Sequence, residues 1–146
     1  MRRLNIGCGS QHRDGFINID GRPLIGVDIV RDVLRGLPFD DDSVDEIYSE
    51  NFLEHLPQGE CIWMMNEMHR IMKPGGMAKH VVPIAGSTNF FQDPTHTAHW
   101  VQETFTYFTM GHIRNLYYGD EIMPWRDVMI DGPNDNGVIF VTMVKP

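Results

Sequence analysis

Cysteine is scarce in this sequence, which holds only Cys8 and Cys61 among its 146 residues. Two cysteines do not make a disulfide framework, and a reducing compartment suits them best. The sequence also has no apolar run long enough to span a bilayer. Because the chain starts MRRLNIG and enters an apolar strand pattern at once, we expect no signal peptide. We therefore predict a cytoplasmic protein that has no membrane partner.

Basic residues are outnumbered by acidic ones. The chain has 12 Lys and Arg against 20 Asp and Glu, which gives a formal net charge of -8. This balance disfavours binding to a nucleic-acid backbone through a general basic surface. The densest group of carboxylates, between Asp40 and Glu46, is typical of a solvated loop. We expect no nucleic-acid partner.

The length suits one domain, residues 1–146, with a substantial core. Short apolar or alternating segments predict strands over residues 3–6, 16–20, 27–33, 44–49, 76–82, 123–130 and 138–144. Helical spacing of apolar residues predicts a helix over about 58–72, ended by Pro74-Gly75-Gly76, and further helix, in one piece or two, over 103–116. This order indicates an α/β fold, namely a mostly parallel sheet with an antiparallel terminal strand.

Glycines or polar residues lie at or directly after the carboxyl end of each of the first four predicted strands. They are Gly7, Cys8 and Gly9, then Asp20, then Asp32 with Val33, and finally Ser49 with Glu50. Ligands of open parallel sheets bind beyond the carboxyl ends of the strands. Glycines let a ligand approach the backbone closely, and carboxylates accept hydrogen bonds from ribose hydroxyls or amines. The set suits an adenosine that carries an amino-acid tail.

Four longer segments occur in order along the first part of the chain. They are LNIGCG at 4–9, FINID at 16–20, LPFDDDSVDEIYSENFLEHL at 37–56 and EMHRIMKPGGMAKHVVP at 67–83. Together they resemble the class I S-adenosylmethionine-dependent methyltransferases, in particular the small methyltransferase-11-like branch. The resemblance implies a Rossmann-like fold and S-adenosylmethionine as cofactor. It implies contacts from Gly7, Cys8 and Gly9 to the methionyl and ribose portion, from Asp20 to the ribose, from Asp32 and Val33 to the adenine, and from Ser49 and Glu50 near the methionyl end.

Two links between strands are shorter than a helical crossover requires. Residues 10–15 and 21–26 separate the first three strands, whereas a crossover helix needs roughly a dozen residues. We predict extended returns in both places. A dinucleotide site needs a helix N-terminus for its pyrophosphate, so the missing helix disfavours a nicotinamide-dependent enzyme. One face of the sheet would lack two helices, and we predict that the tail helix or a second copy in a homodimer covers it.

Three histidines are candidate catalytic residues, because a base is needed when the methyl acceptor must lose a proton. His55 belongs to the Glu-His pair after the fourth strand, and His96 and His99 belong to the pattern D-x-x-H-x-x-H that starts at Asp93. That pattern is also compatible with a metal site or with a polar loop whose side chains cap the backbone. We assign no metal ligand from the sequence.

The sequence thus predicts methyl transfer from S-adenosylmethionine to a small-molecule acceptor that it does not identify. One alternative is a non-catalytic methyltransferase-like module that binds the cofactor, or has lost it, and serves a partner protein. Another is a macromolecular acceptor, for which the acidic charge favours a basic protein over a nucleic acid.

Overall fold

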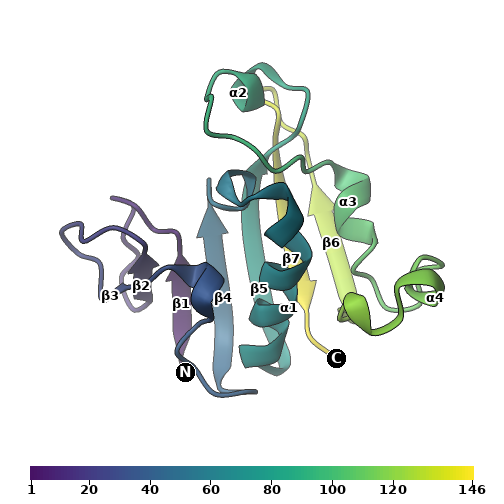
Figure 1. The fold of residues 1–146 in the computed structure, drawn as a ribbon, viewed down its shortest axis with the longest axis horizontal. Helices are drawn as coiled ribbons and strands as arrows, with labels where there is room; N and C mark the ends of the chain where they lie inside the picture. Colours follow the sequence, from purple (N-terminus) through teal and green to yellow (C-terminus); the bar gives the residue numbers. More distant parts are fainter.

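The computed structural model describes residues 1–146, apart from the side chain of Leu116. The described strands form one sheet in the order β3-β2-β1-β4-β5-β7-β6 (Figure 1). In chain order they are β1 (Arg3–Ile6), β2 (Ile17–Asp20), β3 (Ile29–Val30), β4 (Val44–Glu50), β5 (Met72–Pro83), β6 (Asp127–Asp131) and β7 (Val138–Val144). Strands β1 to β5 pair in parallel, and β7 pairs antiparallel with both β5 and β6. The predicted α/β fold is confirmed.

Most helical segments are short. The α-helices are α1 (Cys61–Ile71), α2 (Thr88–Phe91), α3 (Gln102–Thr106) and α4 (Asn115–Tyr118), and the 3-10 helices are η1 (Val33–Arg35), η2 (Leu53–His55), η3 (Gln58–Glu60) and η4 (Gly119–Glu121). Among the described residues, α1 alone is an α-helix that joins two parallel strands, β4 and β5. The helices in the described part of the chain are all too short or too polar to cross a membrane.

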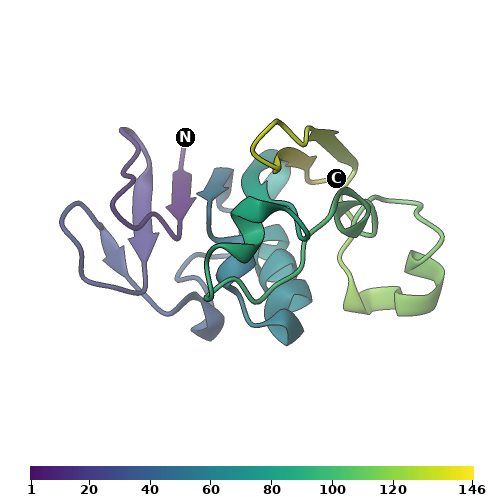
Figure 2. The ribbon, with the colours of Figure 1, turned by 90° about the horizontal axis from the view of Figure 1, so that it is seen from above.

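Helix α1 forms because its apolar residues recur at helical spacing and face the sheet. Its buried apolar residues are Cys61, Met64, Met65, Met68 and Ile71. They share one core with apolar residues of β1, β4, β5 and β7. Figures 1 and 2 show the helix along one face of the sheet.

Strand β5 starts at Met72 rather than at residue 76 as predicted. The segment Pro74-Gly75-Gly76 runs on within the strand because it pairs with the end of the chain. The N–H of Gly75 donates to the carbonyl of Lys145 at 3.1 Å, and the N–H of Lys145 donates to the carbonyl of Gly76 at 3.1 Å. The register of β4 against β5 shifts beside this segment, which accommodates the extra residues.

Three other predicted elements differ in extent. Strand β3 is shorter than residues 27–33, because the side chain of Asp32 already accepts from the N–H of Leu34 and begins η1. The strand expected over 123–130 lies later, at Asp127–Asp131. The helix expected over 103–116 is divided between α3 and α4.

Both early links return without a helix, as predicted, and buried amides hold them in place. The Nδ2 of Asn5 donates to the carbonyl of Gln11 at 2.8 Å and to Oδ1 of Asn18 at 2.9 Å. The carboxylate of Asp28 accepts from the backbone N–H of Asn18 at 2.7 Å. The bond to Gln11 satisfies a backbone carbonyl of the first link, which a crossover helix would otherwise satisfy internally.

The sheet face opposite α1 is more polar than expected. Lys79 pairs with Glu46 at 2.9 Å, and the Arg13 guanidinium carbon lies 3.7 Å from the ring centroid of Tyr48. Met129 and Phe140 are 54% and 43% exposed, respectively. Because polar groups occupy much of this face, it needs less apolar cover than the sequence suggested. The homodimer stays a prediction.

Candidate functional site

A cleft of about 400 Å³ lies beyond the carboxyl ends of β1 to β4. Its volume is in the range typical of small-molecule sites. Strand order reverses between β1 and β4, which is where open α/β sheets bind ligands. The predicted site residues that line the cleft are Gly7, Asp20, Asp32, Val33 and His55.

Gly7 forms the floor of the cleft directly after β1. It has φ of 68°, in the left-handed region that favours glycine. Its N–H donates to the carbonyl of Ile19 at 2.8 Å, which fixes the turn to β2. A side chain here would overlap the ring of Phe52, which packs on the glycine. Only a glycine at this position allows the Phe52 ring to pack on the backbone and leaves the backbone accessible from the cleft.

Asp20 ends β2, and its carboxylate lines the cleft although the residue is only 6% exposed. One oxygen accepts from the N–H of Gly9 at 2.8 Å. The other accepts from the N–H of Arg22 at 2.9 Å and from its Nε at 3.2 Å. Burial acts to raise the pKa of Asp20, but these hydrogen bonds and the Arg22 charge outweigh it, so the pKa lies below the usual value. The carboxylate is ionised and fixed in direction.

Asp32 and Val33 close the side of the cleft formed by the third strand and η1. Oδ1 of Asp32 accepts from the N–H of Leu34 at 3.1 Å as an N-cap, and its side chain is 57% exposed. Val33 is buried and contributes an apolar wall. Its other oxygen, Oδ2, lies 3.5 Å from Nε of the exposed Arg35 side chain. A carboxylate beside an apolar wall can bind the amine edge of a flat ring.

Other predicted cofactor contacts lie outside this lining. Gly9 does not line the cleft, but its N–H donates a hydrogen bond to the Asp20 carboxylate, which does. Cys8 is buried, and burial raises the pKa of its thiol. It lines a separate small cavity of about 50 Å³ together with Glu50. The hydroxyl of Tyr48 donates to Glu50 at 2.7 Å.

Ser49 points into the core instead. It is buried, and its hydroxyl lies 2.8 Å from Nδ1 of His80, which is fully buried. Burial lowers the pKa of His80 to about 4, so the ring is neutral. Ser49 and Glu50 face opposite sides of the sheet because successive strand residues alternate.

The three predicted catalytic histidines have different positions. His55 is exposed on the cleft wall, with Nδ1 3.1 Å from the hydroxyl of Thr95. Partial burial of the ring lowers the pKa of His55 below its ordinary value, and His96 acts in the same direction. The ring of His96 lies 4.7 Å from that of His55 between centroids, and His96 does not line the cleft. His99 is exposed, and its backbone N–H donates to Gln58 at 2.8 Å.

Comparison with protein families decides which kind of protein this geometry belongs to. A model of the methyltransferase domain, Methyltransf_11, matches residues 4–78, about half of the chain. The chain belongs to this methyltransferase domain family. No match is found among curated proteins.

Solved structures similar to this methyltransferase domain agree with the fold. An S-adenosylmethionine-dependent methyltransferase from Archaeoglobus fulgidus has 19% identity and a TM-score of 0.74, over 99% of this chain and 86% of that one. A Haloferax volcanii complex of the Trm112 methyltransferase activator with a methyltransferase has 16% identity and a TM-score of 0.64, over 99% and 82%. A Haemonchus contortus phosphoethanolamine N-methyltransferase, solved with S-adenosylhomocysteine, has 12% identity and a TM-score of 0.65, over 100% and 49%. The predicted family and cofactor agree with these findings.

Sequence reasoning missed several residues of the methyltransferase cleft. Those that the predicted contacts did not include are Gly21, Arg22, Arg31, Asn51, Phe52 and Thr95. Asn51 has φ of 49°, a left-handed conformation that turns the chain at the end of β4. That turn brings Phe52 over Gly7. An Asn directly after a strand was the available signal, because Asn tolerates this conformation better than most residues.

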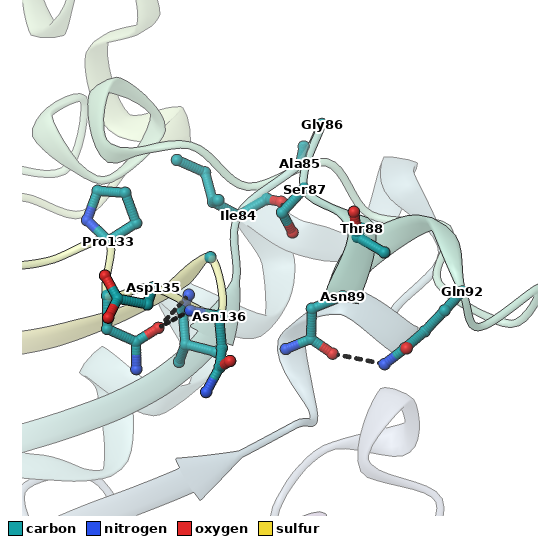
Figure 3. Close-up of a pocket in the computed structure, with 13 residues that line it drawn as sticks. Ile84, Ala85, Gly86, Ser87, Thr88, Asn89, Gln92, Pro133, Asp135 and Asn136 are labelled. Carbon is teal, nitrogen blue, oxygen red and sulfur yellow. Dashed lines mark hydrogen bonds between the residues drawn. The ribbon is translucent and has the colours of Figure 1, made fainter.

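The methyltransferase domain also has a larger cavity, of about 900 Å³, beyond the carboxyl end of β5. Figure 3 shows its two walls, one from residues 84–92 and one from the loop 133–138. Gln92 donates to Asn89 at 2.7 Å along the first wall, and Asn134 accepts from the backbone of the second. Its one ionisable lining residue is Asp135. The cavity is lined by amides and hydroxyls, with a single carboxylate, whereas the cleft has two carboxylates, Asp20 and Asp32.

Proposed function

We propose that the chain binds S-adenosylmethionine in the cleft at the ends of β1 to β4 and transfers its methyl group to a small molecule. The observation that carries the proposal is the convergence of Gly7, Asp20 and Asp32 on one cleft of suitable volume. These residues come from three strand ends, and only the parallel order of the sheet brings them together. Membership of the methyltransferase family supports the same reaction.

The carboxylate of Asp20 would hold the ribose. A carboxylate offers about four acceptor positions. Three of these accept from Gly9 and Arg22, which leaves one for a ribose hydroxyl. The Arg22 side chain is 70% exposed, so it can leave Asp20 and free a position for the second hydroxyl. The donor set of the cleft therefore fits a vicinal diol.

The adenine would lie against Val33, with its amine toward Asp32. The N-cap bond uses one oxygen of the exposed Asp32 carboxylate, and the other pairs with Arg35 at 3.5 Å. Because the Arg35 side chain is 82% exposed, it can move aside and let this oxygen accept from the amine. The uncharged turn at Gly7 would face the methionyl portion, where the bare backbone allows close approach. The ends of β1, β2 and β3 would thus contact the methionyl portion, the ribose and the adenine, respectively.

Methyl transfer from a sulfonium group requires mainly orientation of the reactants and exclusion of water by the protein. S-adenosylmethionine supplies a methyl group on sulfur: an acceptor lone pair forms a bond to the methyl carbon as the carbon–sulfur bond breaks, which leaves S-adenosylhomocysteine. The chain must orient the acceptor and exclude water. Where the acceptor carries a proton, His55 on the cleft wall is placed to receive it. Of the three predicted histidines, it alone lines the cleft.

The acceptor would approach from the segment that follows β5. Residues 84–92 form one wall of the larger cavity, at the same end of the sheet as the cleft. Its amides and hydroxyls suit a small polar acceptor. We extend the proposal to a cytoplasmic enzyme with no nucleic-acid or membrane partner, in keeping with the charge of -8.

A second candidate is a methyltransferase-like module that serves a partner protein. The helix-free links after β1 and β2 favour it, because they trim the domain around the cofactor site. The Haloferax volcanii neighbour offers an example of a methyltransferase in complex with an activator. Such a module would bind S-adenosylhomocysteine but turn over no acceptor alone.

The test is a transfer assay with radiolabelled S-adenosylmethionine and pools of small hydroxyl, amine and thiol acceptors. The enzyme proposal expects label in at least one pool, with loss of transfer in Asp20→Asn. Arg126→Gln serves as the control variant. Arg126 forms an exposed ion pair with Asp127 of β6, the edge strand at the opposite end of the sheet from β3. Cofactor binding without transfer to any pool would favour the module. Absence of both would refute the enzyme and leave only a module that has lost its cofactor.

A further inference from the structure

We propose that Glu54, His55 and His96 form a site for a divalent transition-metal ion, with Zn²⁺ as the model case. Their ligand atoms all lie within 4.8 Å of one another. Glu54 and His55 come from η2, directly after β4, and His96 comes from the loop before α3. The inference does not depend on the proposed function, because the ion would bind to these three side chains without a cofactor.

Glu54 is the observation that points to a ligand. The residue is 0% exposed, and both carboxylate oxygens are buried without a hydrogen-bond partner among the described residues. Burying a carboxylate without a partner is costly, and native proteins nearly always supply one. The nearest basic atom is Nε2 of His96, 3.9 Å from Oε1, which is too long for a hydrogen bond. An ion between the two groups would supply the missing partner.

Both histidines have one ring nitrogen held, as metal-binding imidazoles usually do, and Nε2 of His96 faces two carboxylates, Asp93 at 3.5 Å and Glu54 at 3.9 Å. Nδ1 of His96 lies 2.8 Å from the carbonyl of Phe90, so it donates there and leaves Nε2 with a lone pair. The hydroxyl of Thr95 donates to Asp93 at 2.6 Å and accepts from Nδ1 of His55 at 3.1 Å. His55 is then also left with a lone pair on Nε2. Carbonyl and carboxylate partners of this kind fix metal-binding imidazoles.

The backbone holds the two parts of the cluster together. The carbonyl of Glu54 accepts from the N–H groups of Thr97 at 2.8 Å and Ala98 at 3.0 Å. The hydroxyl of Thr97 donates to the carbonyl of Leu56 at 2.8 Å. These bonds tie the loop that carries His96 to the segment that carries Glu54. Most of the ordering that ion binding requires is therefore already present.

The donor set narrows the choice of ion. Two imidazoles and one carboxylate suit Zn²⁺, Co²⁺, Ni²⁺ or Fe²⁺ better than Mg²⁺ or Ca²⁺, which prefer all-oxygen sites. Three protein ligands leave a coordination position open. Because His55 lines the cleft, that position would be reached from the cleft side. With an ion on its Nε2, His55 could not take a proton, and a bound acceptor hydroxyl or thiol would be acidified by the ion instead.

The experiment measures Zn²⁺ binding by calorimetry and metal analysis on tag-free, chelator-treated protein without cofactor. We expect one equivalent of Zn²⁺ per chain. Glu54→Gln and His96→Gln should each weaken binding by at least tenfold, since even the outer partners of metal ligands typically contribute about 10- to 100-fold. His99→Gln is the matched control, because His99 belongs to the same loop but not to the cluster.

A measurement on the wild-type chain guards against variants that fail to fold. A bound ion stabilises the folded state, so excess Zn²⁺ should raise the Tm of the wild-type protein. Failure of the wild-type chain to take up Zn²⁺, or uptake that Glu54→Gln leaves unchanged, would overturn the metal site. Neither result bears on S-adenosylmethionine binding, which is measured separately in metal-free buffer.

Discussion

Replacing Gly7 by alanine tests the floor of the cleft. The substitution places a methyl group at a φ of 68°, which costs an L-residue about 1 kcal/mol or more. It also overlaps the Phe52 ring, and overpacking of this kind costs about 1–3 kcal/mol. We expect Gly7→Ala to lower the free energy of unfolding by about 3 kcal/mol, and the Tm by roughly 6–12 °C for a chain of this size. Urea denaturation followed by tryptophan fluorescence measures the first quantity.

Two further variants separate the contributions. Gly59→Ala is the matched control, because a methyl group there meets no atom within 4 Å and its φ is not positive. In a Phe52→Ala background, Gly7→Ala should cost only the part of the loss that comes from φ, because the overlap with the ring is gone. If Gly7→Ala were as stable as Gly59→Ala and bound S-adenosylhomocysteine like the wild type, the close packing of Phe52 on Gly7 would be refuted.

Three predictions concern the rest of the molecule. The pKa of buried His80 is about 4 against 6.5 when unfolded, so the unfolded state binds the proton first, and His80 alone should lower stability by roughly 3 kcal/mol between pH 6.5 and pH 4. His69 acts in the same direction, whereas burial raises the pKa of Glu54 to about 7 and opposes the fall, so urea titrations should reveal the His80 part as the difference between the wild type and His80→Asn. Arg70 bonds to Glu67, Asp41 and two carbonyls of the loop before β4, so Arg70→Ala should lower the Tm by several degrees, and an unchanged Tm would contradict that role. Light scattering at micromolar concentration should give the mass of a dimer, whereas a monomeric mass would end the homodimer prediction.

The position of the cleft could be predicted because a glycine or a carboxylate marks the strand ends in the sequence. Asp20 closes an alternating apolar run, and Gly7 follows another, so the residue pattern alone places both at strand ends. The extended returns could be predicted from the lengths of the links alone. What the sequence could not show is how those returns are held, because Asn5 meets Asn18 only once β1 and β2 pair.

The side chains after β4 were harder to place, because one residue of slip reverses the face of a strand. Ser49 and Glu50 are adjacent, yet Ser49 bonds to His80 in the core and Glu50 accepts from Tyr48 on the other face. The left-handed turn at Asn51 then resets the alternation. Glu54 could not be singled out for a different reason. Its burial depends on the loop of His96, some forty residues later, folding over it.

Calorimetric titration with S-adenosylhomocysteine tests the central claim most directly. The wild-type chain should bind one equivalent. Asp20→Asn should weaken that binding by roughly 10- to 150-fold, because a hydrogen bond to a charged group contributes about 1.5–3 kcal/mol. Absence of binding to the wild-type chain, or equal affinity in the wild type and a folded Asp20→Asn variant, would contradict a cofactor site at the ends of β1 to β4.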